Sequence, residues 1–280
     1  MEIRLIAMDL DGTALQNDRC TFSPRLHDAL HAAHRQGIAI VPITGRQYKL
    51  LPHVLQATQP WANLAVLCNG GQIRDMNTGT VLYSLAMPPE SLKQLLTLAE
   101  KYCLPIEFSV DSTLYLTQAS YDKQLPYPSL AFHRDTILAA HGQIVDSLEP
   151  LCHLEIEKVN LLCITNDIRD SVKQHLESIA VSAVWSSSSS MEITHPKATK
   201  GQGLQRICSV LNIPMSAVMA LGDSGNDITM LQQAGLGVAM GNAPDFVKQA
   251  ADVCTLRYDE DGAALAIEKY VLRAEGGKIE

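Results

Sequence analysis

Two carboxylates, Asp9 and Asp11, stand two positions apart directly after the apolar run from Ile3 to Met8. Side chains at positions i and i+2 of an extended segment lie on the same side, so both acids can reach one substrate atom or one divalent cation. Neighbouring carboxylates repel each other unless a cation or a shared proton compensates, so the pair indicates chemistry more than stability. A tight turn at Gly12 after a strand is the alternative interpretation of the same residues.

A second acidic cluster also follows an apolar run and contains Asp223 and Asp227 beside permissive glycines. Mg²⁺ binds a few carboxylate oxygens and keeps several waters, and Asp9, Asp11 and Asp223 could supply those oxygens. A turn is again the alternative. Two acidic clusters at the ends of two buried strands are harder to explain as turns than either cluster alone.

Two further segments carry groups that can hold phosphate oxygens. Thr44, Gly45 and Arg46 form one segment, and Lys200 with Gly201 forms the other. A hydroxyl, a glycine amide that a ligand can approach closely and a cation all suit an oxyanion. Arg46 could instead form a structural salt bridge.

The apolar runs before these residues predict the elements that position them. Short runs alternate with longer amphipathic stretches, which is typical of a parallel sheet covered by helices. In such a sheet, ligands bind outside the carboxyl ends of the strands. We therefore expect five strands whose ends meet at one crevice: Ile3–Met8 before Asp9, Ile38–Ile43 before Thr44, Leu64–Cys68 before Asn69, Ala217–Leu221 before Asp223 and Gly235–Ala239 before Asn242. Asn69 could contact substrate or complete a turn.

The stretch after Ser23 predicts a helix with Pro24 at its first position and a stop at Gly37. Three histidines fall along it at helical spacing, His27, His31 and His34. That spacing could hold a metal, but it is not the HExxH pattern, and we interpret the three side chains as a solvated helix face.

The pattern changes between about Tyr83 and Ser186. A helix opened by Pro88, Pro89 and Glu90 precedes strand-like segments at Ile106–Val110, Leu114–Thr117, Val159–Thr165 and Val181–Trp185. The serine run Ser186–Ser190 is a hinge or linker at a domain boundary or, equally, an exposed loop. The predicted fold class is α/β: a Rossmann-like core with a parallel sheet and helices on both faces in residues 1–82 and 187–280, with an inserted α+β cap in residues 83–186.

Composition and charge narrow the class of protein. The chain has 280 residues and a formal net charge of -8, which repels phosphate backbones and anionic membranes, so we expect no nucleic-acid or membrane partner. No apolar run approaches the roughly 18 residues of a membrane helix, and acids follow the short N-terminal apolar run, so we expect a cytoplasmic protein. The seven cysteines show no CxxC spacing and predict neither a zinc site nor a disulfide framework.

Taken together, the motifs resemble those of the haloacid dehalogenase superfamily, specifically its Cof-type phosphatases, over nearly the whole chain. The segments that carry the resemblance are DLDGT at Asp9–Thr13, ITGR at Ile43–Arg46, CNGG at Cys68–Gly71, EITHPKATKG at Glu192–Gly201, LGDSGND at Leu221–Asp227, AMGNA at Ala239–Ala243 and DGAALAIEKY at Asp261–Tyr270. Their order and spacing make the match specific.

The resemblance implies a two-step phosphoryl transfer with Mg²⁺ as cofactor. Asp9 would attack phosphorus and form an aspartyl phosphate, and Asp11 would act as general acid and then as general base. The Asp9 carboxylate, the Asp11 backbone carbonyl and Asp223 would bind Mg²⁺, with Asp227 in direct contact with the ion or one layer behind.

The resemblance also assigns the groups that hold phosphate. These are Thr44, the Gly45 amide, Lys200, Asn226 and the Leu10 amide, with Arg46 as a further phosphate or substrate contact. Lys200 fits the spacing of the motif better than Lys197, which stands close by. The substrates implied are small phosphomonoesters, such as sugar phosphates or phosphorylated cofactors, with the cap setting specificity. We expect the protein to be a monomer or weak homodimer. A phosphotransferase or phosphomutase of the same superfamily, and a non-catalytic regulator that binds phosphorylated metabolites, are the alternatives.

Overall fold

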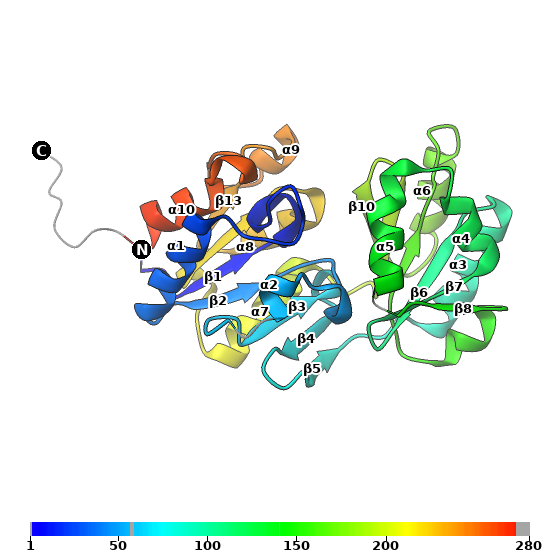
Figure 1. Ribbon diagram of the computed structural model, residues 1–280, viewed down its shortest axis with the longest axis horizontal. Coiled ribbons are helices and arrows are strands. Elements are labelled where there is room, and N and C mark those ends of the chain that lie inside the picture. The colour runs from blue at the N-terminus through cyan, green and yellow to red at the C-terminus, as the bar shows by residue number, and fades with distance from the viewer. Residues whose placement is uncertain (1, 57–58, 140, 273–280) are drawn as a thin grey trace, which may run out of the picture. The chain divides into compact units, whose positions relative to one another are not determined.

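The computed structural model describes residues 2–56, 59–139 and 141–272, and it divides into two compact units (Figure 1). The first unit takes its described residues from 1–44, 51–82 and 199–280. The second unit consists of residues 45–50 and 83–198. The chain therefore leaves the first unit twice and returns to it twice.

The first unit is built on a five-stranded sheet of order β14-β13-β12-β1-β2, in which every neighbouring pair is parallel. Two of its inner strands, β1 and β12, are buried along their whole length, as expected of a parallel sheet that is covered on both faces. The strands are β1 (Leu5–Met8), β2 (Ala39–Pro42), β12 (Val218–Gly222), β13 (Leu236–Ala239) and β14 (Val253–Cys254).

Helices flank this sheet in packed pairs, α1 with α10 and α7 with α8. Helix α1 begins as its sequence predicts: the Ser23 hydroxyl accepts a hydrogen bond from the Leu26 amide at 3.1 Å, and Pro24 takes the first position. Because side-chain caps satisfy amides that a helix leaves unpaired, they fix where it starts. The helices of the unit are α1 (Pro24–Arg35), α2 (His53–Gln56), α7 (Lys200–Leu211), α8 (Ile228–Gln233), α9 (Asp245–Lys248) and α10 (Gly262–Tyr270).

The third predicted core strand does not lie in the parallel sheet, and the expectation of five strands in one sheet is wrong on this point. Strand β3 (Leu64–Leu67) pairs antiparallel with β4 (Gln72–Asp75), in a separate sheet of order β3-β4-β5 that includes β5 (Val81–Ser84). A single parallel bridge, Ile43 with Val66, joins it to the segment after β2. Strand β4 occupies one edge of β3, and at this bridge the Thr44 amide donates to the Val66 carbonyl at 2.9 Å.

The second unit contains a six-stranded sheet of order β10-β11-β9-β6-β7-β8, antiparallel except for the pair β7 and β8. Its apolar face carries Phe108, Val159 and Ile193, which belong to one buried cluster with side chains of α3 and α6. The strands are β6 (Ile106–Val110), β7 (Thr113–Thr117), β8 (Gln143–Val145), β9 (Ile156–Leu161), β10 (Ser182–Ser187) and β11 (Ser190–Thr194). The helices are α3 (Pro89–Lys101), α4 (Gln118–Gln124), α5 (Ala131–Ala139) and α6 (Arg169–Glu177).

The opposite face of the same strands is polar, because side chains alternate along a strand. Glu107, Asn160 and Glu192 lie side by side across β6, β9 and β11, and Lys158 is the next residue of β9 on that face. Glu107, Lys158 and Asn160 are nevertheless buried. Each of these side chains must therefore find a polar partner inside the unit.

The serine run is not a linker between the units but the tip of a hairpin, with Ser186–Ser188 exposed, and the second unit extends beyond the predicted limit at residue 186. Ser186 and Ser187 end β10, Ser190 begins β11, and a two-residue turn joins them into a hairpin. Met191 and Ile193 of β11 are buried in the apolar cluster of the second unit. Residues 187–198, which we expected in the core, therefore belong to the second unit, as do residues 45–50.

Within the described residues, no helix is both long enough and apolar enough to cross a membrane.

Candidate active site

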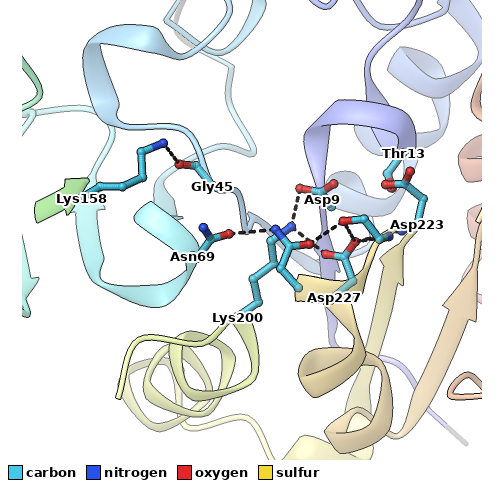
Figure 2. Close-up of polar contacts among 10 residues, drawn as sticks. Asp9, Thr13, Gly45, Asn69, Lys158, Lys200, Asp223 and Asp227 are labelled. Atoms are coloured by element: carbon cyan, nitrogen blue, oxygen red, sulfur yellow. Dashed lines mark hydrogen bonds and ion pairs between the residues drawn. The ribbon is translucent and has the colours of Figure 1, made fainter. Parts of the chain in front are cut away.

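The neighbouring strands β1 and β12 bring the two acidic segments together. Asp9 follows the last residue of β1, and its amide donates to the carbonyl of Leu221 on β12 at 3.0 Å. Asp223 follows the last residue of β12. Parallel pairing aligns the carboxyl ends of both strands, so segments more than 200 residues apart in sequence meet at one edge of the sheet (Figure 2).

A buried lysine lies between two of these carboxylates. Lys200 Nζ is 2.6 Å from Asp9 Oδ1 and 2.6 Å from Asp227 Oδ1, and the lysine is 1% exposed. Thr199 caps α7 by accepting a hydrogen bond from the Gln202 amide, which places Lys200 at the first position of the helix. Burial alone would lower the pKa of Lys200, but the charges of Asp227 and Asp9 outweigh it and raise the pKa above its ordinary value. Lys200 is therefore a permanent cation.

The carboxylates outnumber this cation. Burial raises the pKa of Asp9 well above its ordinary value, because desolvation and the charges of Asp227 and Asp223 together exceed the opposing effect of Lys200. Burial, followed by the charge of Asp227, raises the pKa of Asp223 to about 7. Because the pKa values of two neighbouring carboxyls are both raised, the site carries an excess of negative charge, which a bound cation would neutralise.

The Asp227 carboxylate accepts hydrogen bonds at both oxygens. Its Oδ1 receives the Lys200 ammonium, and its Oδ2 receives the amides of Asp223 and Ser224, each at 2.9 Å. Gly222 packs so closely on Asp227 that a Cβ there would overlap its side chain. Asp227 thus holds both the lysine and the loop that carries Asp223.

Asp223 is oriented by two side chains from other segments. Thr13 Oγ1 donates to its Oδ1 at 3.2 Å, and Asn242 Nδ2 donates to its Oδ2 at 3.0 Å. Asn242 also donates to the Gly12 carbonyl at 2.9 Å, and thereby joins the loops after β1, β12 and β13. Gly12 has φ +77° and lies where a Cβ would overlap the Asp223 carboxylate, so only glycine fits this turn.

Thr13 and Asn242 were not among the predicted site residues. Both stand in motifs quoted for the resemblance, and Asn242 also stands at a predicted strand end. The motifs and, for Asn242, the strand end were the sequence signals that could have found these residues, but their contacts with Asp223 join segments that are distant in the chain.

A second group lies at the ends of β2 and β3. Asn226 Nδ2 donates to Asn69 Oδ1 at 2.9 Å, and the amide of Asn69 donates to the Thr44 carbonyl at 3.0 Å. The Ser224 hydroxyl donates to Asn226 Oδ1 at 2.5 Å. Thr44 and Asn69 are buried, and Asn69 adopts a left-handed backbone conformation with φ +55°. The structure therefore brings Thr44, Asn69 and Asn226 together within the first unit.

The remaining predicted residues fall in three places. Leu10 and Asp11 lie in the turn after Asp9, with Leu10 buried and Asp11 half-buried. Gly45 and Arg46 belong to the second unit, where Arg46 Nη1 donates to the Leu50 carbonyl at 3.2 Å. Lys197 is exposed in a turn, so Lys200, rather than Lys197, is the lysine that contacts the carboxylates.

The acidic cluster fits a hard divalent cation. One carboxylate oxygen each from Asp9, Asp223 and Asp227 lies within 4.8 Å of the others. Mg²⁺ prefers such oxygen ligands and needs only one or two carboxylates besides water. Asp9 and Asp223 are the better candidates. Both oxygens of Asp227 already hold Lys200 or backbone amides, whereas Lys200 bonds to Asp9 at Oδ1, and the donors to Asp223 are the neutral side chains of Thr13 and Asn242.

Comparison with known proteins gives a consistent result. The sequence profile described as haloacid dehalogenase-like hydrolase matches residues 6–267. The phosphatase YwpJ of Bacillus subtilis (strain 168) is 30% identical over 94% of this chain and 98% of its own. The pyridoxal phosphate phosphatase YbhA of Escherichia coli (strain K12) is 29% identical over 90% of this chain and 93% of its own. Among solved structures, the HAD subclass IIB sugar phosphatase BT4131 is 25% identical, with a TM-score of 0.80 over 95% of this chain and 98% of its own.

Proposed function

The chain belongs to the haloacid dehalogenase-like hydrolases of the Cof type and is a phosphatase, and we propose that it hydrolyses small phosphomonoesters through an aspartyl phosphate on Asp9 with the help of Mg²⁺. The observation that carries the proposal is the position of Asp9. It lies at the carboxyl end of β1, 2.6 Å from the buried Lys200, within a cluster of carboxylates that calls for a cation.

The first step of the proposed reaction transfers the phosphoryl group to the protein. A carboxylate oxygen of Asp9 attacks phosphorus, and the bond between phosphorus and the ester oxygen breaks. Asp11 gives its proton to the departing alcohol. In the second step, water attacks the phosphorus of the aspartyl phosphate, Asp11 takes a proton from that water, and Asp9 and inorganic phosphate are released.

The other residues stabilise charge during both steps. Lys200, the amides of Leu10 and Gly45, Thr44 and Asn226 are proposed to hold the oxygens of the transferring group. Asp9, the Asp11 backbone carbonyl and Asp223 would hold Mg²⁺, which offsets repulsion between the nucleophile and an anionic substrate. Preorganised charges and dipoles of this kind supply the largest share of many enzymatic accelerations.

Sugar phosphates and phosphorylated cofactors are the substrate classes we propose. A relative and a structural neighbour support this choice, because one is named a pyridoxal phosphate phosphatase and the other a sugar phosphatase.

The test is the release of inorganic phosphate from a panel of sugar phosphates, pyridoxal phosphate and nucleotides. Each compound is assayed with Mg²⁺, with EDTA and with the Asp9→Asn protein. Release that needs both Mg²⁺ and Asp9 supports the proposal. A folded protein that releases phosphate equally well in EDTA would contradict the metal requirement. Addition of a sugar acceptor checks for a phosphotransferase, which would yield a transfer product in place of phosphate.

A further inference from the structure

A second buried lysine, Lys158, contacts the chain directly after the predicted phosphate-binding Thr44. Its Nζ donates to the Gly45 carbonyl at 2.7 Å and to Glu192 Oε1 at 2.7 Å (Figure 2 shows the contact with Gly45). Lys158 lies on β9, and all three residues belong to the second unit. The lysine is 4% exposed, and the Glu192 side chain is 17% exposed.

Stability alone does not explain this lysine. Removing an ammonium and a carboxylate from water costs several kcal/mol per ion, and a buried pair often adds little net stability compared with apolar side chains of similar volume. Here the ammonium does more than pair with a carboxylate, because it also contacts a backbone carbonyl. Glu192 fixes the lysine, and the lysine fixes the Gly45 carbonyl.

Gly45 is thereby held on both sides. The Thr44 carbonyl, on the N-terminal side, accepts a hydrogen bond from the Asn69 amide at 3.0 Å. The Gly45 carbonyl, on the C-terminal side, accepts the bond from Lys158. The N–H of Gly45 lies in the same rigid plane as the Thr44 carbonyl. Glycine has the widest backbone freedom of any residue, so contacts on both flanking peptides are what restrict its conformation.

We propose that Lys158, oriented by Glu192, is a positioning residue that fixes the peptide after Gly45 and, together with the contact on the peptide before it, keeps the Gly45 amide directed at a phosphate oxygen. This inference rests on the proposed function, because it takes the Thr44–Gly45 segment as part of the phosphate site. Lys158 itself does not touch the reacting atoms in this account. It acts through the backbone of Gly45.

Three variants test the proposal: Lys158→Met, Glu192→Gln and, as a matched control, Glu107→Gln. Glu107 is a buried glutamate on the same face of this sheet, on the strand at the other side of β9, and it accepts hydrogen bonds from Asn160 and His133. The probe is inorganic phosphate, whose Kd is measured by calorimetry in the presence of Mg²⁺. The values of kcat and KM for the best substrate and the Tm of each variant are measured alongside.

We expect Lys158→Met to weaken phosphate binding about tenfold and to lower kcat by about 10- to 100-fold, because small misplacements of a binding group cost this much. Glu192→Gln should change both quantities in the same direction by a smaller factor. Glu107→Gln should lower the Tm but leave the Kd for phosphate unchanged.

If Lys158→Met alone does not fold, the double variant Lys158→Met with Glu192→Met replaces it in the test. The double variant removes both charges, so no carboxylate is left without its partner. A folded double variant that binds phosphate as tightly as the wild type would overturn the proposal. The same conclusion would follow if Glu107→Gln weakened phosphate binding as much as Glu192→Gln. Failure of the proposed function looks different, because the wild-type protein itself would then release no phosphate from any substrate.

Discussion

Replacement of Lys200 by methionine tests two roles of the buried lysine: it compensates the charges of Asp9 and Asp227, and it is proposed to hold a phosphate oxygen. Methionine keeps much of the length and apolar volume of the side chain but removes its charge. The substitution deletes two hydrogen bonds of 2.6 Å and leaves the carboxylates of Asp9 and Asp227 without their cation. Both carboxylates are buried, so water replaces the lost ammonium poorly.

The size of the effect follows from this geometry. Removing one partner of a buried ion pair costs about 3–5 kcal/mol. The pKa of Asp9 is already raised, so this carboxyl can take up a proton and relieve part of the repulsion, which favours the lower end of that range. At roughly 2–4 °C per kcal/mol, a loss of about 3 kcal/mol lowers the Tm by about 6–12 °C. The loss of one preorganised donor to the transition state should also lower kcat by about 10²- to 10³-fold.

The assay combines kcat for the best substrate with unfolding in urea, on Lys200→Met and on Lys197→Met as control. Lys197 is an exposed lysine three positions earlier, so its replacement should leave kcat and stability nearly unchanged. The double variant of Lys200→Met with Asp227→Asn should recover part of the stability and none of the activity. A Lys200→Met protein with kcat within threefold of the wild type would refute the role of Lys200 in holding phosphate.

Three further predictions concern the surroundings of the site and the second unit. The first concerns the buried pair of Glu107 and His133. Burial disfavours the charged form of each group, but the attraction between the two charges outweighs burial. The contact therefore lowers the pKa of Glu107 below 4.5 and raises the pKa of His133 above 6.5. The pair therefore stabilises the fold most between pH 4.5 and pH 6.5, and this contribution is lost as the pH rises through the raised pKa of His133. Urea unfolding should show that His133→Gln lowers the stability more near pH 6 than near pH 8.5. Asn242→Ala should weaken Mg²⁺ binding by about 10- to 100-fold in calorimetry, since groups that orient metal ligands have effects of this size; unchanged affinity would contradict its contact with Asp223. Gly12→Ala should abolish phosphate release in a folded protein, and retained activity would show that the turn can move away from Asp223.

Local patterns predicted the elements whose ends are set by local chemistry. The N-cap Ser23 and Pro24 mark the start of α1 because capping involves only neighbouring residues. The segment Ile106–Val110 coincides with β6, since alternation of apolar and polar side chains is itself a local signal. Strand β9 ends at Leu161, earlier than predicted, and Cys163 beyond it adopts a left-handed conformation with φ +58°.

Strand pairing was harder to predict than strand position. Nothing in Leu64–Leu67 indicates that it pairs along its length with β4 and meets the chain after β2 only at the bridge between Ile43 and Val66, because pairing depends on which segments the folded chain brings close. The composition of Ser186–Ser190 suggested a linker, but the apolar neighbours Met191 and Ile193 hold the run in a hairpin.

In the candidate site, too, the residues at strand ends could be predicted from the sequence, whereas contacts between distant segments could not. The rule that ligands bind at the carboxyl ends of parallel strands led to Asp9 and Asp223 from pattern alone. The contacts of Asn242 with Asp223 and of Lys158 with Gly45 join segments far apart in the sequence. The strand-end rule also placed Asn242 at this edge of the sheet, but neither contact can be read from the spacing of the residues, so the folded chain is needed to reveal them.

The measurement that tests the central claim most directly is a search for a phosphoryl group on Asp9. The Asp11→Asn protein lacks the group proposed to activate water. It is mixed with substrate and Mg²⁺, quenched in acid and digested. The mass of the peptide that contains Asp9 is then measured by mass spectrometry. The account predicts that this peptide gains the mass of one phosphoryl group and that the Asp9→Asn protein shows no such gain. Wild-type turnover with no phosphorylated Asp9 peptide from either the wild type or the Asp11→Asn protein would contradict an aspartyl phosphate mechanism.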